Sequence, residues 1–140
     1  MERPAVVTGY SGTPLAKKLG IKQGSCILRI DSPPQYEKLL EPMLMGVSFV
    51  SRPSQQVDLA HVFVTQQGDL IKRLSALREK LKTETPVWVS WPKKAAKVPT
   101  TVTEDTIREA ALPMGYVDTK VCAVSEVWSA LKLVVRKELR

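Results

Sequence analysis

The stretch VWVSWPKKAAK, residues 87–97, holds the side chains best suited to bind a charged ligand. Two tryptophans flank a short apolar run, which ends at a proline and continues into three lysines. An indole beside ammonium groups suits a ring that bears phosphate, because the ring stacks while the lysines supply positive charge. The same lysines would equally suit a solvated loop that keeps an apolar strand soluble. Trp91 is the better stacking candidate, whereas Trp88 is predicted to be a core residue on the opposite face of a strand.

Residue types that commonly perform catalysis are few and poorly placed in this chain. His61 is the only histidine, and its apolar neighbours predict a hydrogen-bonded core residue. Cys26 and Cys122 each lie in an apolar run, without the close Cys or His neighbour that a metal or redox site needs. No two carboxylates are spaced for acid–base catalysis. The sequence therefore predicts no metal site, and it favours a protein that is not an enzyme.

The composition is that of a folded, basic protein. The 140 residues fit one domain, and the hydrophobic share of 44% is ordinary for a globular chain. The net charge of +7 attracts phosphorylated ligands, acidic proteins or nucleic acid. Nucleic acid is the weaker choice, because the basic residues are scattered and no nucleic-acid-binding motif is visible. The apolar runs are too short to cross a bilayer and no export signal is visible, so we expect a cytoplasmic protein without membrane association.

The elements that would position these residues alternate between strands and helices. Caps and turn residues set most of their ends: Thr13 and Gly20 bound the first helix, Ser32 caps the second, and Thr103 caps the last. The leucines at 70, 74, 77 and 81 form one stripe of an amphipathic helix. The predicted strands are 25–30, 46–51, 57–64, 85–91, 116–124 and 128–137, and the predicted helices are 14–19, 35–40, 68–82 and 104–111.

This order predicts a single α/β domain over residues 1–140, with residues 1–24 forming an N-terminal loop and a short helix that packs on the sheet. Alternation implies a three-layer, Rossmann-like fold with a mostly parallel sheet of about six strands. The two final strands follow each other directly and predict a C-terminal antiparallel hairpin, in which Val117, Thr119, Val121 and Ala123 share one face. A generic α+β layer with another strand order remains the alternative. The hairpin also leaves an edge strand that could pair with a second copy in a homodimer.

Several blocks of the sequence resemble a known family. TPLAKKLGIKQG, VWVSWPKK and VDTKVCAV…WS…LKLVVRK are similar to a bacterial family catalogued only as a domain of unknown function, and the match extends over almost the whole chain. The resemblance implies a small cytosolic protein with no assigned activity. A looser similarity in the order of elements, from SCILRI onward, is to the class I methyltransferase fold, which is a Rossmann-like sheet that closes with a long hairpin.

If the sheet is doubly wound, ligands bind beyond the carboxyl ends of its strands, where the strand order reverses. The residues predicted to line that crevice are Asp31, Ser32, Thr65, Gln66, Ser90, Trp91, Lys93 and Lys94. A conventional nucleotide does not suit it, because the first turn is Asp-Ser-Pro-Pro and prolines offer no N–H groups to a ligand. The chain also has no G-x-G-x-x-G or Walker A motif, so no cofactor is expected.

The sequence thus favours a non-catalytic binding or regulatory module that takes a small anionic ligand or an acidic partner at this rim. Two alternatives stay open. One is a degenerate methyltransferase-like enzyme with a rebuilt cofactor site, which only the fold similarity supports. The other is a nucleic-acid-binding protein, which only the basic charge supports.

Overall fold

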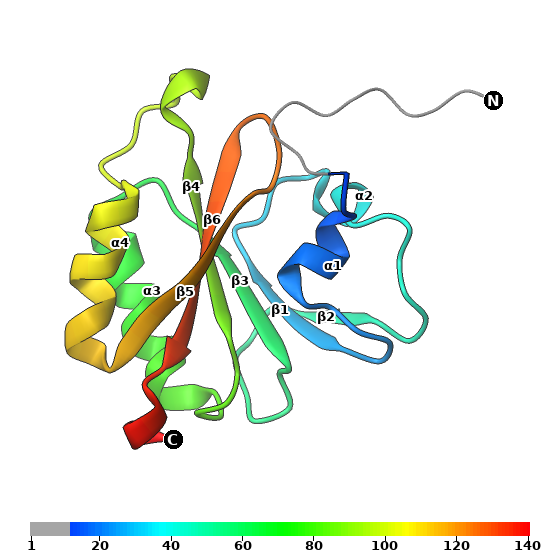
Figure 1. Cartoon of the computed structure of the whole chain (residues 1–140), viewed down its shortest axis with the longest axis horizontal. Helices are drawn as coiled ribbons and strands as arrows, with labels where there is room; N and C mark the ends of the chain where they lie inside the picture. Colours follow the sequence, from blue (N-terminus) through cyan, green and yellow to red (C-terminus); the bar gives the residue numbers. More distant parts are fainter. Residues whose placement is uncertain (1–11) are drawn as a thin grey trace.

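The computed structural model describes residues 12–140, so the first part of the predicted N-terminal loop, residues 1–11, lies outside the described residues. Six strands form one sheet in the order β2-β1-β3-β4-β6-β5 (Figure 1). Their bounds are Cys26–Ile30 for β1, Ser48–Val50 for β2, Leu59–Phe63 for β3, Val87–Pro92 for β4, Tyr116–Ala123 for β5 and Trp128–Val135 for β6.

The strand directions confirm the predicted α/β fold. β1 is parallel to both β2 and β3, and β3 is parallel to β4. β6 then pairs antiparallel with β4 and with β5, so the predicted C-terminal hairpin closes the sheet. After β1 the chain adds β2 on one side and then returns to add β3 on the other, which places the reversal of strand order between β1 and β3.

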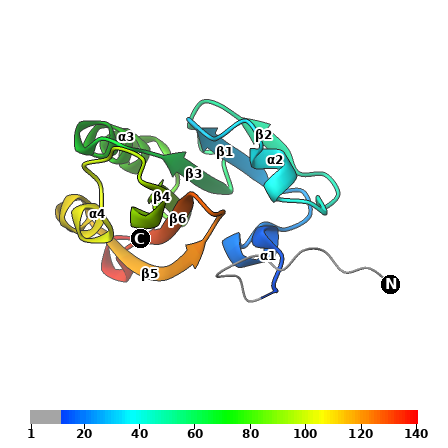
Figure 2. The same cartoon turned by 90° about the horizontal axis from the view of Figure 1, so that it is seen from above.

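Helices cover both faces of the sheet (Figure 2). The short helices α1 (Leu15–Leu19) and α2 (Tyr36–Leu39) pack on one face, where their buried side chains join one core cluster. The longer helices α3 (Gln67–Lys80) and α4 (Glu104–Ala111) pack on the other face and belong to a second cluster. All four leucines of the predicted stripe are buried in that second cluster, which confirms the amphipathic helix; Leu81 lies just beyond its end.

The predicted helix caps are right at one end and wrong at another. The Thr103 hydroxyl accepts a hydrogen bond from the Thr106 N–H at 3.2 Å, and Thr106 returns one to the Thr103 N–H, so Thr103 caps α4 as expected. Ser32 does not cap α2, because Gln35 precedes that helix and Ser32 accepts a hydrogen bond from Arg29 Nε instead. Pro14 is the residue before α1 rather than its first residue.

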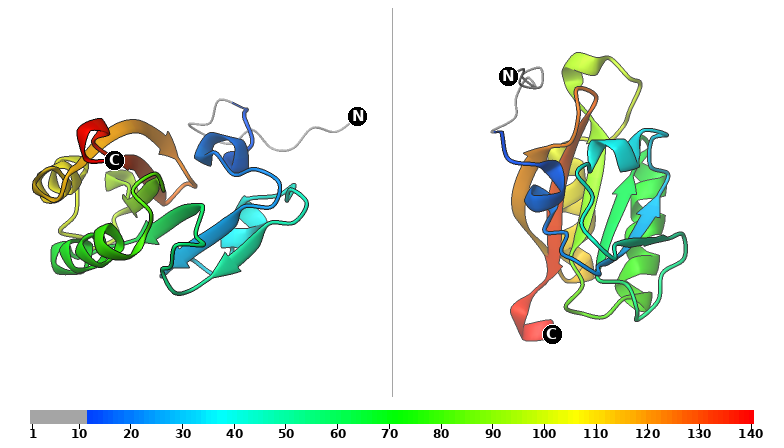
Figure 3. Two further views of the ribbon diagram at one scale, coloured as in Figure 1. Left: turned by 90° about the horizontal axis from the view of Figure 1, so that it is seen from below. Right: turned by 90° about the vertical axis from the view of Figure 1, so that its right-hand side faces the viewer.

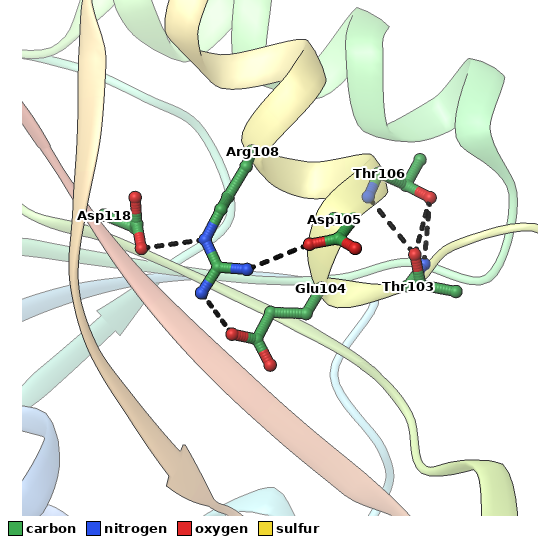
Figure 4. A network of polar contacts seen from close by, with 6 residues as sticks. All are labelled: Thr103, Glu104, Asp105, Thr106, Arg108 and Asp118. Carbon is green, nitrogen blue, oxygen red and sulfur yellow. Dashed lines mark hydrogen bonds and ion pairs between the residues drawn. The ribbon is translucent and has the colours of Figure 1, made fainter.

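Arg108 of α4 ties that helix to the hairpin (Figure 4). Its guanidinium donates to Asp118 of β5 at 2.9 Å, to Asp105 at 3.1 Å and to Glu104. Hydrogen bonds to Asp118 and Glu104 raise the pKa of Arg108, and the bond from Arg108 lowers the pKa of Asp118. The cluster is solvent-accessible, so we assign it a positioning role for β5 rather than a large share of stability.

Strand β5 departs from simple alternation at one point. Asp118 pairs with Leu133 and Lys120 pairs with Lys132, so Thr119 is an extra residue in the ladder. Such an irregularity turns the residues on its two sides toward opposite faces. The prediction that Val117 and Val121 share a face is therefore wrong, because Val117 pairs with Val134 and Val121 pairs with Leu131.

Gly115 ends the α4 region in a left-handed conformation with φ of +97°. A Cβ there would lie 2.8 Å from the end of the Leu139 side chain, which is exposed enough to move. We therefore expect Gly115→Ala to destabilise the protein by about 1–2 kcal/mol, from the positive φ alone. Urea unfolding measures this difference. A matched Gly68→Ala control, at a helical glycine with open space around its Cβ, should not destabilise.

Candidate functional site

Parallel strands bring the predicted site residues to one edge of the sheet. β1, β3 and β4 are parallel, so the turn after β1 and the lysines after β4 lie at the same edge, as the sequence predicted. Residues 93–101, which we call the lysine loop, leave β4 at this edge, near the turn of the β5–β6 hairpin and far from the C-terminus (Figures 1 and 3). The predicted pocket therefore has the correct position in the fold, while its binding role stays a prediction.

The polar groups after β1 already have partners within the protein. Asp31 has a φ of +55° and forms an ion pair with Arg73 of α3 at 3.1 Å. The Ser32 hydroxyl accepts from Arg29 Nε at 2.9 Å, and the same guanidinium donates to Glu37 at 2.7 Å. This end of β1 is thus a compact network of internal ion pairs.

The end of β3 holds the base of the lysine loop. The Thr65 carbonyl accepts hydrogen bonds from the Thr101 N–H at 2.9 Å and from the Thr100 hydroxyl at 2.7 Å. The carbonyl of Gln66 accepts the Leu70 N–H at the start of α3. Thr65 and Gln66 therefore anchor the two neighbouring segments through their backbones.

Two of the predicted site residues are buried on opposite faces of β4. Ser90 has no exposed surface and lies on the α1 face, whereas Trp91 is 9% exposed and packs with α3 and α4. Trp88 lies in the α1-side cluster, so the two indoles are on different faces as predicted. A ligand at the rim would reach Ser90 or Trp91 only by displacing core side chains.

The lysine loop carries positive charge without internal compensation. Its Lys93 N–H donates to the Val127 carbonyl at 2.7 Å, a 3-10 turn spans Lys94–Ala96, and Lys97 has a φ of +56°. Within residues 12–140, none of the ion pairs includes Lys93, Lys94 or Lys97. Arg29 and Arg73 at the same edge do have carboxylate partners, so the loop differs from its surroundings.

A buried chain of hydrogen bonds crosses the α1 face of the sheet. The Tyr36 hydroxyl lies 2.8 Å from His61 Nδ1, and His61 Nε2 lies 2.7 Å from the Ser90 hydroxyl. Burial lowers the pKa of His61 to about 3, so the imidazole is neutral, and burial also raises the pKa of Tyr36. None of the three side chains is exposed, which confirms His61 as a hydrogen-bonded core residue rather than a catalytic base.

Two cavities lie away from the rim, where the sequence predicted no site. One of about 490 Å³ lies between α1 and the hairpin, and one of about 410 Å³ lies at the amino ends of β1 and β3. Lys120 lines the first and Lys132 lines the second. The described part of the chain has no cluster of His, Cys, Asp and Glu that could hold a metal ion, and its helices are too short or too polar to span a bilayer.

Solved structures with a similar arrangement of elements are methyltransferases by name. A SAM-dependent methyltransferase from Aquifex aeolicus matches with a TM-score of 0.60 and 15% identity, over 87% of this chain and 88% of that one. A candidate type 11 methyltransferase from Sulfolobus solfataricus matches with a TM-score of 0.57 and 15% identity, over 88% and 90%. The fibrillarin of Aeropyrum pernix, in complex with S-adenosyl-L-methionine, matches with a TM-score of 0.52 and 12% identity, over 86% and 72%. At these identities the similarity establishes a methyltransferase-like fold and nothing about activity.

Comparison with curated proteins gives no match to this chain. A family model does match it, over residues 16–137, and the description of that family is "Protein of unknown function (DUF3052)". The matched residues include every described helix and strand except the first residue of α1 and the end of the final 3-10 turn.

Proposed function

Because this chain belongs to the DUF3052 family, whose function is unknown, its role has to be argued from its own side chains, and we propose that it is a non-catalytic binding module for an acidic partner. The partner docks on the lysine loop. One observation carries the proposal: Lys93, Lys94 and Lys97 gather on one projecting loop and, among the described residues, have no carboxylate within ion-pair distance.

The shape of the loop favours an acidic protein surface over a small ligand. The 3-10 turn projects beyond the sheet, and Lys94 and Lys97 are exposed (Figure 3). A projecting group of like charges attracts an oppositely charged surface at long range and loses that attraction in salt. The hydrogen bonds of Thr65 to Thr100 and Thr101 hold the base of the loop, so the lysines start from a defined position.

Methyl transfer is the second candidate, since the fold resembles that of the methyltransferases named above. The turn after β1 does not fit the cofactor S-adenosylmethionine. Pro33 and Pro34 offer no N–H groups, the Pro33 carbonyl accepts the Tyr36 N–H, and α2 is only four residues long. Folds that bind such a ligand use glycines and a helix N-terminus at this place. We therefore derive no methyl-transfer step, and we place the module in the cytosol, where two free cysteines are ordinary.

The proposal predicts that Lys93→Ala, Lys94→Ala and Lys97→Ala together will raise the Kd for a synthetic Asp/Glu-rich peptide at least about tenfold. Calorimetry at two salt concentrations measures this, and the melting temperature should stay within about 1 °C of wild type. The matched control is Lys80→Ala with Lys82→Ala, which removes charge at the other end of α3.

Three results would count against the proposal. Equal weakening by the control pair would mean that net charge alone drives binding. Tighter binding of a single-stranded oligonucleotide than of the peptide would favour nucleic-acid binding. A clear rise in melting temperature with millimolar S-adenosylmethionine would favour the transferase.

A further inference from the structure

The face of the sheet that carries α1 is only partly covered. α1 and α2 pack over β1, β3 and β4, whereas on this face only Ala130, Val124 and their neighbours near the hairpin turn join the core cluster. The remaining part of β5 and β6 borders the cavity of about 490 Å³, between the strands and α1 (Figure 2). This volume is typical of a small-molecule site.

The irregularity in β5 brings two lysines together at this place. Because Thr119 is an extra residue, Lys120 pairs with Lys132 rather than with Leu131. Lys132 in turn pairs with Trp88, whose indole lies on the α1 face, so both lysines are on that face. Strict alternation would instead have put Lys120 on the same face as Asp118, toward α4 and Arg108.

The pairing is electrostatically unfavourable as it stands. Like charges directly opposite each other on a sheet destabilise it. Burial lowers the pKa of Lys132, and the neighbouring Lys120 lowers it further. Across the part of the chain that the structure describes, no ion pair includes either lysine. Asp58, the carboxylate of the smaller cavity, accepts the Cys26 N–H at 2.8 Å.

We propose that the surface between α1 and the β5–β6 hairpin binds a small organic phosphate, whose phosphate group lies between the ammonium groups of Lys120 and Lys132. A dianion neutralises both cations at once, and lysine binds phosphate as a point charge. The Ser129 hydroxyl at the cavity can donate a further hydrogen bond. The organic part fills the cavity of about 490 Å³ against the side chains of Val121 and Ala123. This site is separate from the lysine loop.

The test measures binding of inorganic pyrophosphate and adenosine 5′-monophosphate by calorimetry at constant ionic strength, with citrate as a carboxylate of similar charge. We expect both phosphates to bind, citrate to bind more weakly, and Lys120→Gln with Lys132→Gln to raise the phosphate Kd at least about tenfold. Without ligand, Lys120→Gln should raise the melting temperature in low salt by about 1–3 °C, because it removes the like-charge contact.

Matched variants separate this site from the others. Lys38→Gln, on the exposed side of α2, and the triple lysine-loop variant should both keep wild-type phosphate affinity. If the lysine-loop variant loses phosphate binding instead, the phosphate belongs to the rim and the inference fails. It also fails if pyrophosphate does not bind at about 10 mM, or if the Lys120/Lys132 variant binds it as the wild type does.

A second measurement needs no charge substitution. Cys122 is half-buried in the same cavity, so a bound phosphate compound should shield its thiol. In a Cys26→Ser background, adenosine 5′-monophosphate should slow alkylation of Cys122 at least about threefold at saturation, a factor that follows from the occupied fraction. An unchanged alkylation rate at a concentration that saturates binding would place the ligand elsewhere.

Discussion

We expect the protein to lose about 2 kcal/mol of stability between pH 6.5 and pH 5 through His61 alone. The pKa of His61 is about 3 in the folded protein, because the imidazole is fully buried, against 6.5 when exposed. The folded pKa is the lower one, so the unfolded chain binds the extra proton throughout the window between these values. Stability is therefore full above pH 6.5 and falls by about 1.4 kcal/mol per pH unit as the pH drops toward 3.

Urea unfolding at pH 7, 6 and 5 measures this slope. His61 is the only histidine, so this part of the pH range is free of other imidazoles. His61→Gln should flatten the dependence, although its stability at pH 7 will be lower. Tyr36→Phe is the matched control, because it removes one hydrogen bond of the buried chain and keeps the imidazole, so its slope should remain. An unchanged slope in His61→Gln would show that the imidazole titrates normally in the folded state.

The second large effect is expected from Trp88, the largest fully buried side chain among the described residues. Trp88→Ala should destabilise the protein by about 3–5 kcal/mol, through lost burial and the cavity that remains. The indole Nε1–H also donates to the Leu19 carbonyl at 2.9 Å, at the end of α1. The substitution therefore removes both the packing and the hydrogen bond that hold this short helix on the sheet.

Two further variants separate these contributions. Trp88→Phe keeps most of the volume and leaves the Leu19 carbonyl without its donor, so we expect a smaller loss of about 1–3 kcal/mol. Trp128→Ala truncates a half-buried indole on the same face and should cost less than Trp88→Ala. Equilibrium unfolding in urea gives all three values. A cost below about 1.5 kcal/mol for Trp88→Ala would contradict the packing described here.

Much of the fold could be predicted because its signals are local. The leucine stripe, the Thr103 cap and the alternation of strands with helices each depend on neighbouring residues, and together they specify a mostly parallel sheet with a final hairpin. The Ser32 cap was wrong because a hydroxyl near a helix start has more than one partner within reach, and here Arg29 Nε supplies the donor.

The candidate site was predictable only as far as strand direction determines it. Parallel pairing places Asp31 and Lys93 at one edge, but it does not reveal that Asp31 already pairs with Arg73. The partners of His61 come from elements far apart in the chain and have no sequence signature. The pairing of Lys120 with Lys132 depends on one extra residue in a strand, which a regular alternation pattern conceals.

The strand order also bears on how the chain reaches its folded state during synthesis. β4 is flanked by β3, which is made earlier, and by β6, which is made some forty residues later. Until the ribosome releases residues 128–135, the apolar strand Val87–Pro92 has an open hydrogen-bonding side that invites association with other chains. Folding of the sheet is thus expected to finish after translation of the hairpin, and nascent chains stalled before it should require a chaperone.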